Sequence, residues 1–241
     1  MTEVAHADQP RTSGDAADVD TIELLALVAH LQHVAFGRLA EDAREAPQIA
    51  QQLELSRLAA AAVHRRDRVL TRVTELGGDA EECVGTFAAL LDDFDSRTQP
   101  STWWERLLRS YVAEGVSDDF CRIAAGAVDE TSRVLLLEVL DDAAHAELAV
   151  AELETAGAQD EVLVSRLALW GRRLVGEALG VVQQALAGHP ALVRLVSRRP
   201  AAVEGGVTAG TTSGTEDAGP KLFGELTAEH TRRMSRLGLT A

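Results

Sequence analysis

The chain has 241 residues, of which 46 % are hydrophobic and only 4 % aromatic, and its formal net charge is −15. Ala, Leu and Val dominate, which favours helices packed on helices over a sheet. The negative charge argues against broad nucleic-acid binding, which needs a basic surface. Two cysteines without a CxxC motif argue against a disulfide framework, and no secretory signal or long apolar run stands out. We therefore expect a cytoplasmic protein that does not enter a membrane.

The N-terminal residues 1–20 are mostly small or polar, and we expect a disordered tail there. A first helix is predicted from about residue 21 to residue 46. Asp20 or Thr21 suits its N-cap, and Pro47 closes it.

A second helix is predicted from about residue 48 to residue 76, and the two-residue connection places it antiparallel to the first. A shorter helix over 79–94 and a loop over 96–101 then separate this pair of helices from the next. A third long helix is predicted to start near Thr102. A long connection of this kind suits a crossover between two halves of a four-helix bundle.

The central helix is predicted over 131–156, a stretch without Pro or Gly. Its apolar residues recur at steps of three and four, which indicates one buried stripe made of Val134, Leu137, Leu140, Ala144, Leu148 and Ala151. Asp142 and His145 are three residues apart and stand on one face. A carboxylate and an imidazole in this arrangement can hold one metal ion, as in di-iron bundles.

In the C-terminal third of the chain, the sequence predicts a helix over about 160–187 and a short helical piece that ends near residue 196. Residues 198–219 are rich in Gly, Thr and Ala and show no periodicity, so we expect a flexible linker. An amphipathic helix follows, and we expect it to dock on the bundle. The predicted organisation is a tail (1–20), a helical bundle (21–197), the linker (198–219) and a docking helix (220–241).

A di-iron bundle needs one carboxylate from each of two helices and a carboxylate-x-x-His from each of two others. The second helix pair supplies Asp142-x-x-His145. It also offers Glu114, Asp118 or Asp119 about 24 to 28 residues earlier, where two antiparallel helices cross at one level.

The first helix pair lacks this pattern. Its nearest counterpart to the motif is Ala62-x-x-Arg65, with His64 one place out of register, and Gly37 stands 25 residues before Ala62. Polar residues about one turn from the position of Gly37 are Gln32, His33, Glu41 and Asp42. A shifted mononuclear site made of His33, His64 and His145 is an alternative arrangement.

Three segments carry a resemblance to a known family: RLAEDAREAP (38–47), ALWGRRLVGEAL (168–179) and EHTRRM (229–234). They look like segments of ferritin-like bacterial proteins related to the tRNA methylthio-isopentenyl-adenosine hydroxylase, a non-haem di-iron enzyme. The similarity covers nearly the whole chain after residue 20. It implies an all-α, ferritin-like four-helix bundle with additional C-terminal helices. In complete members it also implies a di-iron site and, in the enzyme branch, O2-dependent hydroxylation.

Carried over by position, only Asp142, His145 and one acidic residue among Glu114, Asp118 and Asp119 match ligands of that family. Gly37, Ala62 and Arg65 stand where the pattern calls for Glu, Glu and His. An unpaired buried charge costs several kcal/mol. We therefore hypothesise that Arg65 takes the place of the metal by pairing with Asp142 or Asp118.

Two functions follow from these patterns. The first is a non-catalytic ferritin-like protein that needs no cofactor and acts by binding or assembly, with an unidentified protein or a second copy as its partner. The alternative is an iron-dependent oxidoreductase of the tRNA-hydroxylase type. In that case Asp142, His145, Asp118 and Glu114 would hold iron, and tRNA would be the nucleic-acid partner.

Overall fold

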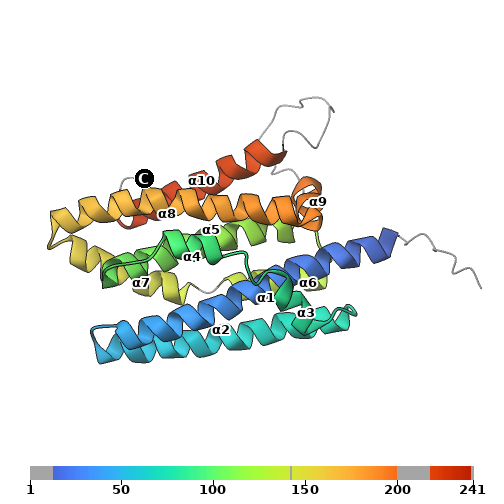
Figure 1. Ribbon diagram of the computed structural model, residues 1–241, viewed down its shortest axis with the longest axis horizontal. Coiled ribbons are helices and arrows are strands. Elements are labelled where there is room, and N and C mark those ends of the chain that lie inside the picture. Colours follow the sequence, from blue (N-terminus) through green and yellow to red (C-terminus); the bar gives the residue numbers. More distant parts are fainter. Residues whose placement is uncertain (1–12, 142, 200–217, 240–241) are drawn as a thin grey trace, which may run out of the picture.

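The computed structural model describes residues 13–141, 143–199 and 218–239. Within these ranges every regular element is a helix, which confirms the predicted all-α class (Figure 1). The helices are α1 (Ser13–Glu45), α2 (Ile49–Glu75), α3 (Ala80–Thr86), α4 (Asp92–Arg97), α5 (Trp103–Ala125), α6 (Glu130–Leu140), α7 (Ala144–Gly157), α8 (Glu161–Gly188), α9 (Pro190–Arg198) and α10 (Ala218–Arg236).

The long helices form three layers. Figure 1 shows α1 and α2 side by side along one edge, α8 and α10 along the opposite edge, and α5, α6 and α7 between them. Helices α1, α2 and α5, together with α6 and α7 in succession, make a four-helix bundle. Helices α8, α9 and α10 are additional C-terminal elements that cover α5 and the N-terminal part of α1.

Short polar side chains start several of these helices. Asp79, Thr102, Asp129 and Asp160 each accept a hydrogen bond from a backbone N–H in the first turn of the helix that follows. This satisfies donors that have no partner inside the helix. At the end of α2, Gly77 adopts a φ of 84°, which glycine reaches without steric cost.

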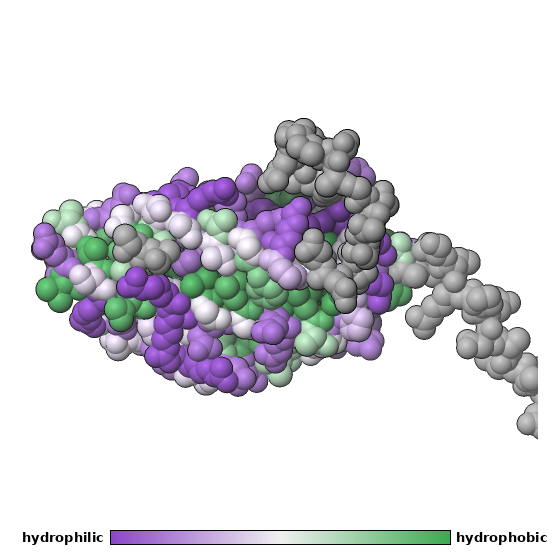
Figure 2. All heavy atoms as spheres, turned by 90° about the horizontal axis from the view of Figure 1, so that it is seen from above, coloured by the Kyte–Doolittle hydropathy of each residue, from purple (hydrophilic) through white to green (hydrophobic). Residues whose placement is uncertain are grey.

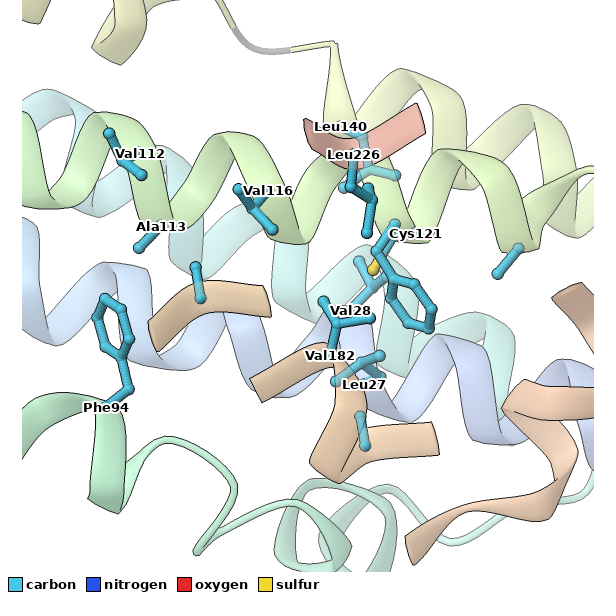
Figure 3. Close-up of a cluster of buried hydrophobic side chains, with 14 of the residues drawn as sticks. Leu27, Val28, Phe94, Val112, Ala113, Val116, Cys121, Leu140, Val182 and Leu226 are labelled. Atoms are coloured by element: carbon cyan, nitrogen blue, oxygen red, sulfur yellow. The ribbon is translucent and has the colours of Figure 1, made fainter. Parts of the chain in front are cut away.

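The core runs through all three layers. Figure 3 shows Leu27 and Val28 on α1 facing Val116 and Cys121 on α5, with Val182 of α8 close by. One stretch of α1, Ala17–Glu45, is long and apolar enough to cross a membrane. In its most apolar window of 18 residues, 56 % is buried in the bundle, as expected for a core helix.

The start of α1 differs from the prediction, because the helix begins at Ser13 and not near residue 21. Asp20 is therefore no N-cap. Its side chain is 1 % exposed and accepts hydrogen bonds from Arg194 and Arg198 of α9. This contact joins residues more than 170 positions apart in the sequence and holds the polar first turns of α1. Patterns within a few neighbouring residues cannot predict it. The first 12 residues of the predicted tail lie outside the described residues.

The central helix predicted over 131–156 is interrupted, because α6 ends at Leu140 and α7 begins at Ala144. The guanidinium group of Arg122 donates to the carbonyl oxygen of Leu140, which satisfies an acceptor freed at the helix end. The buried face also differs. Val134 and Leu137 are 45 % and 38 % exposed, whereas Leu136 and Val139 are buried. Asp142, the centre of the predicted motif, lies outside the described residues.

The segment between the two halves of the bundle, residues 79–101, also differs from the prediction because it forms two short helices. One helix was predicted over 79–94, but α3 and α4 are separate and α4 extends into the predicted loop. Phe87, Leu90, Leu91 and Phe94 are buried, so this connection packs on the bundle with its apolar side. Packing of these side chains explains why the chain turns between α3 and α4.

Candidate functional site

A cavity of about 60 Å³ lies inside the molecule between the four-helix bundle, α4 and α8. Space of this size holds a few water molecules, since each needs roughly 10–15 Å³. Most of the wall is apolar, including Leu31, Leu58 and Val181. The polar residues of the wall are Gln32, Arg38, Arg65, Glu114, Ser117, Asp118 and His145.

The acidic side of the cavity comes from α5 and from the first turn of α7. Nδ1 of His145 lies 2.7 Å from Oε2 of Glu114, a hydrogen bond between helices 31 residues apart in sequence. Burial by itself raises the pKa of Glu114, but the charge and hydrogen bond of His145, with Arg38 and Arg65 further away, lower it overall. Glu114 is therefore ionised at neutral pH.

Asp118 stands one turn after Glu114 on α5, so both carboxyl groups face the same cavity. Burial, followed by the negative charge of Glu114, raises the pKa of Asp118 to about 7. Oε1 of Glu114 is buried without a hydrogen-bond donor from the described part of the chain. The acidic wall therefore presents acceptor groups to whatever fills the cavity.

The opposite wall is basic. Nε of Arg65 on α2 donates to Oε1 of Gln32 on α1 over 2.8 Å, and Gln32 is only 8 % exposed. Arg38, further along α1, also lines the cavity. Its Nη2 lies 2.5 Å from Oδ1 of Asp95 on α4. The α1–α2 half of the bundle thus contributes two guanidinium groups and an amide, with no carboxylate among its described lining residues.

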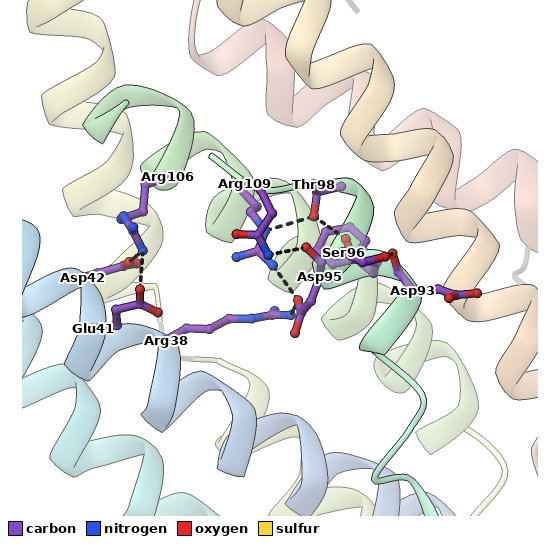
Figure 4. Close-up of polar contacts among 11 residues, drawn as sticks. Arg38, Glu41, Asp42, Asp93, Asp95, Ser96, Thr98, Arg106 and Arg109 are labelled. Carbon is purple, nitrogen blue, oxygen red and sulfur yellow. Dashed lines mark hydrogen bonds and ion pairs between the residues drawn. The ribbon is translucent and has the colours of Figure 1, made fainter. Parts of the chain in front are cut away.

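Helix α4 closes the cavity on its outer side. The ring of Phe94 lines the cavity and is 2 % exposed, with the guanidinium carbons of Arg38 and Arg109 at 5.6 Å and 5.3 Å from its centroid. Figure 4 shows Arg38 and Arg109 converging on Asp95, which accepts a hydrogen bond from each. Cation–π contacts and this shared carboxylate fix α4 in place.

The structure thus brings together four residues that the sequence singled out: Glu114, Asp118, His145 and Arg65. The hydrogen bond that the described residues show for Arg65 goes to Gln32, and not to Asp118. A pairing of Arg65 with Asp142 concerns a residue outside the described part.

Several other candidates lie away from the cavity. Gly37 is exposed with open space around it, so it does not occupy a ligand position, and Ala62 is buried in a separate apolar cluster. His33 and His64 are exposed, which overturns the shifted mononuclear site. Glu41 and Asp42 pair with Arg106 near the end of α1 (Figure 4), and Asp119 pairs with Arg233 of α10.

Equal registers in the two helix pairs would put position 37 in the cavity, but packing sets each register separately. The structure places Gln32 there and leaves Gly37 on the surface. Arg38, Ser117 and Phe94 were missed altogether. A signal existed for Arg38, because Leu31, Ala35, Arg38 and Leu39 recur at helical spacing on the inward face of α1.

The described residues do not fit a di-iron centre. Such a centre needs carboxylates from both halves of the bundle, but here the α1–α2 wall carries Arg38 and Arg65, whose charges repel metal ions. Across the described ranges, no three His, Cys, Asp or Glu side chains are grouped so that they could hold a metal ion. Asp142 is outside that search.

The fold and the site together define a ferritin-like helical bundle with a mixed-charge cavity. Residues 15–199 match a family described as "Ferritin-like domain, actinomycetes". This match covers well over half of the 241 residues, so the chain belongs to that family. A comparison with curated proteins gave no match. The family match ends at residue 199, and α10 lies beyond it.

Proposed function

We propose that this protein is a non-catalytic ferritin-like binding protein, in which the central cavity holds a small organic molecule instead of two iron ions. The observation that carries the proposal is the basic wall. Arg65 is held by Gln32, and Arg38 lines the same cavity as Glu114 and His145. Fixed guanidinium groups supply positive charge where a di-iron protein would need ligands.

The chemistry of the wall suggests what such a molecule carries. Oε1 of Glu114 and the carboxyl group of Asp118 offer acceptors, and most of the remaining lining is apolar. A ligand with at least two hydrogen-bond donors, such as a small diol or a primary amine with a short apolar body, would satisfy them. Water is the default occupant of a polar cavity of this size.

The first test is metal content. Protein produced in iron-rich medium, and protein incubated with ferrous iron under exclusion of air, should contain no stoichiometric iron. Iron bound at one or two equivalents, and lost in Glu114→Ala, would overturn the proposal.

The second test is ligand binding, measured as a shift in melting temperature with a panel of short-chain alcohols and amines. Binding should be lost in Glu114→Gln and kept in Glu138→Gln. Glu138 is a suitable control because it is 56 % exposed and pairs with Arg68 on the surface. If neither variant changes binding, the cavity is not the binding site.

An iron-dependent oxidoreductase of the tRNA-hydroxylase type remains the second candidate. It is favoured by the Glu114–His145 pair and by Asp118, which line the same cavity, although these three side chains are not grouped closely enough to hold one metal ion by themselves. Oxygen consumption in the presence of a reductant and iron, abolished in His145→Ala, would support this function. The net charge of −15 disfavours tRNA as a partner.

Assembly with a second copy is a further part of the proposal. Ile49, Leu53, Val162 and Leu169 are 54 % to 70 % exposed and belong to the first turns of α2 and α8. Both helices start at the same end of the molecule in Figure 1, and Figure 2 shows hydrophobic atoms at that end. Light scattering on the wild type and on Val162→Asp/Leu169→Asp tests it, with a smaller mass expected for the variant.

A further inference from the structure

Helix α10 occupies a groove between α5 and α8. Leu222, Leu226 and Met234 of α10 are fully buried there, and α10 also contacts α9. Two glycines allow the close approach. A Cβ atom on Gly115 of α5 would lie 2.2 Å from Nε of Arg233, and one on Gly171 of α8 would lie 2.2 Å from Cε of Met234. The groove is therefore shaped for this helix in this register.

Arg233 anchors the helix in the groove. Its Nη2 donates to the carbonyl oxygen of Gly115 over 3.0 Å and to Oδ2 of Asp119 over 2.5 Å. Tyr111 donates from its hydroxyl group to the carbonyl oxygen of Arg233. Asp119 also pairs with Arg122 at 3.5 Å, so its charge is shared between two guanidinium groups.

One residue of α10 opposes this docking. His230 is 2 % exposed, and neither ring nitrogen has a hydrogen-bond partner in the described ranges. Burial, followed by the charge of Arg233, lowers the pKa of His230 to about 4. The docked state therefore holds the neutral ring and disfavours the imidazolium.

The charged and titratable groups of the surrounding helices do not offset the free-energy cost of an imidazolium at His230. On α5 these are Tyr111, Asp118 and Asp119. Asp119 pairs with Arg122 of α5 and with Arg233 of α10, and the buried carboxyl group of Asp118 interacts with the charges of the same two arginines. At the α9 end, Arg199 pairs with Glu225 of α10. On α8, Arg166 pairs with Glu105, and Arg173 and Glu177 contact Arg97, so these side chains are engaged away from α10. No carboxylate on these elements pairs with His230.

The connection to α10 is longer than the docked position requires. Arg199 pairs with Glu225 through 2.7 Å and 3.1 Å contacts, so the end of α9 lies beside the second turn of α10. Residues 200–217 join them, and a chain of that length can span about 60 Å when extended. The family match ends at residue 199, so α10 is an addition to the matched domain.

We propose that the α5–α8 groove is a helix-docking surface that α10 occupies reversibly, and that protonation of His230 releases α10 in mildly acidic solution. The groove fits an amphipathic helix with leucines four residues apart and an arginine seated over Gly115. Its occupant is α10 of the same chain, because the tether keeps that helix at high local concentration. This inference does not depend on what the cavity binds.

Hydrogen exchange of the full chain, read by mass spectrometry and corrected for the intrinsic effect of pH, tests the proposal. The opening equilibrium of α10 should rise about 30-fold between pH 7.5 and pH 5, since an undocked histidine titrates near 6.5. Amides of α8 should keep their protection over this range. The rise should disappear in His230→Phe and persist in His64→Phe, where an exposed histidine is replaced.

Three results would overturn the proposal. They are equal protection of α10 at both pH values, the same pH dependence in His230→Phe as in the wild type, and opening of α10 only together with α8. A doubled mass with protection that depends on protein concentration would assign the groove to α10 of a second copy, against docking within one chain. Gly171→Ala gives an independent check: it should lower the protection of α10 at every pH while α5 remains protected.

Discussion

The guanidinium group of Arg65 on α2 donates from Nε to Oε1 of Gln32 on α1, 2.8 Å away, across the cavity from Glu114 and His145. Arg65→Ala removes a positive charge near Glu114 and leaves the amide of Gln32 without this partner. We expect a loss of about 2–3 kcal/mol in the free energy of unfolding, the usual cost of breaking a buried polar network. Urea denaturation at pH 7 measures it.

Arg57→Ala is the matched control on the same helix. Arg57 is 70 % exposed and pairs with Glu54 on the surface, and such pairs contribute less than about 1 kcal/mol. Equal effects of the two substitutions would mean that the contact of Arg65 with Gln32 contributes no more to stability than a surface ion pair.

Asp118→Asn should stabilise the protein at pH 8. The folded-state pKa of Asp118 is raised to about 7 from 3.8, so the neutral form is favoured by folding, and this stability is lost as pH rises through 7. Asn keeps the site neutral at every pH. We expect a gain on the order of 2–4 kcal/mol at pH 8 that falls toward zero near pH 4.

Unfolding free energies of the wild type and of Asp118→Asn, measured at pH 4, 6 and 8, check how the stability gain depends on pH. Asp67→Asn serves as the control, since the side chain of Asp67 is 57 % exposed. A constant difference between wild type and Asp118→Asn at all three pH values would contradict the prediction.

Phe94→Ala should destabilise the protein by about 3–4 kcal/mol, the cost of a cavity left by a buried aromatic side chain. It also removes the ring that Arg38 and Arg109 stack on, so α4 should lose hydrogen-exchange protection before the long helices do. Phe36→Ala removes a ring that is 38 % exposed on α1 and should cost less than half as much. Protection of α4 that is unchanged in Phe94→Ala would show that other contacts hold this helix.

Asp20→Ala tests the junction between α1 and α9. The carboxylate is buried, but Arg194 and Arg198 are 52 % and 46 % exposed and regain water when their partner is lost. We therefore expect a moderate loss of about 1–2 kcal/mol. Thermal unfolding measures it against Asp18→Ala, an exposed residue half a turn away. Similar melting temperatures for both variants would contradict a role of Asp20 in holding α9.

Much of the fold is visible in the sequence because its signals are local. The Gly77-Gly78 stop, Thr102 as an N-cap and Pro190 at the start of α9 each act through backbone geometry of a few residues. Periodic apolar residues then predict both ends of α2 and α8, and the start of α5, to within about two residues. The same periodicity misassigned the buried face of α6, because Val134 and Leu137 are as apolar as Leu136 and Val139.

An all-helical chain, the order of its long helices and a half-site of acid and histidine residues can be read from the amino-acid sequence. Which side chains meet depends on the packed fold. It placed Gln32 in the cavity and Gly37 outside, broke the central helix before Ala144, and seated Arg233 over Gly115. Helix propensity and caps depend on neighbours in sequence, whereas the register between helices depends on packing over the whole core.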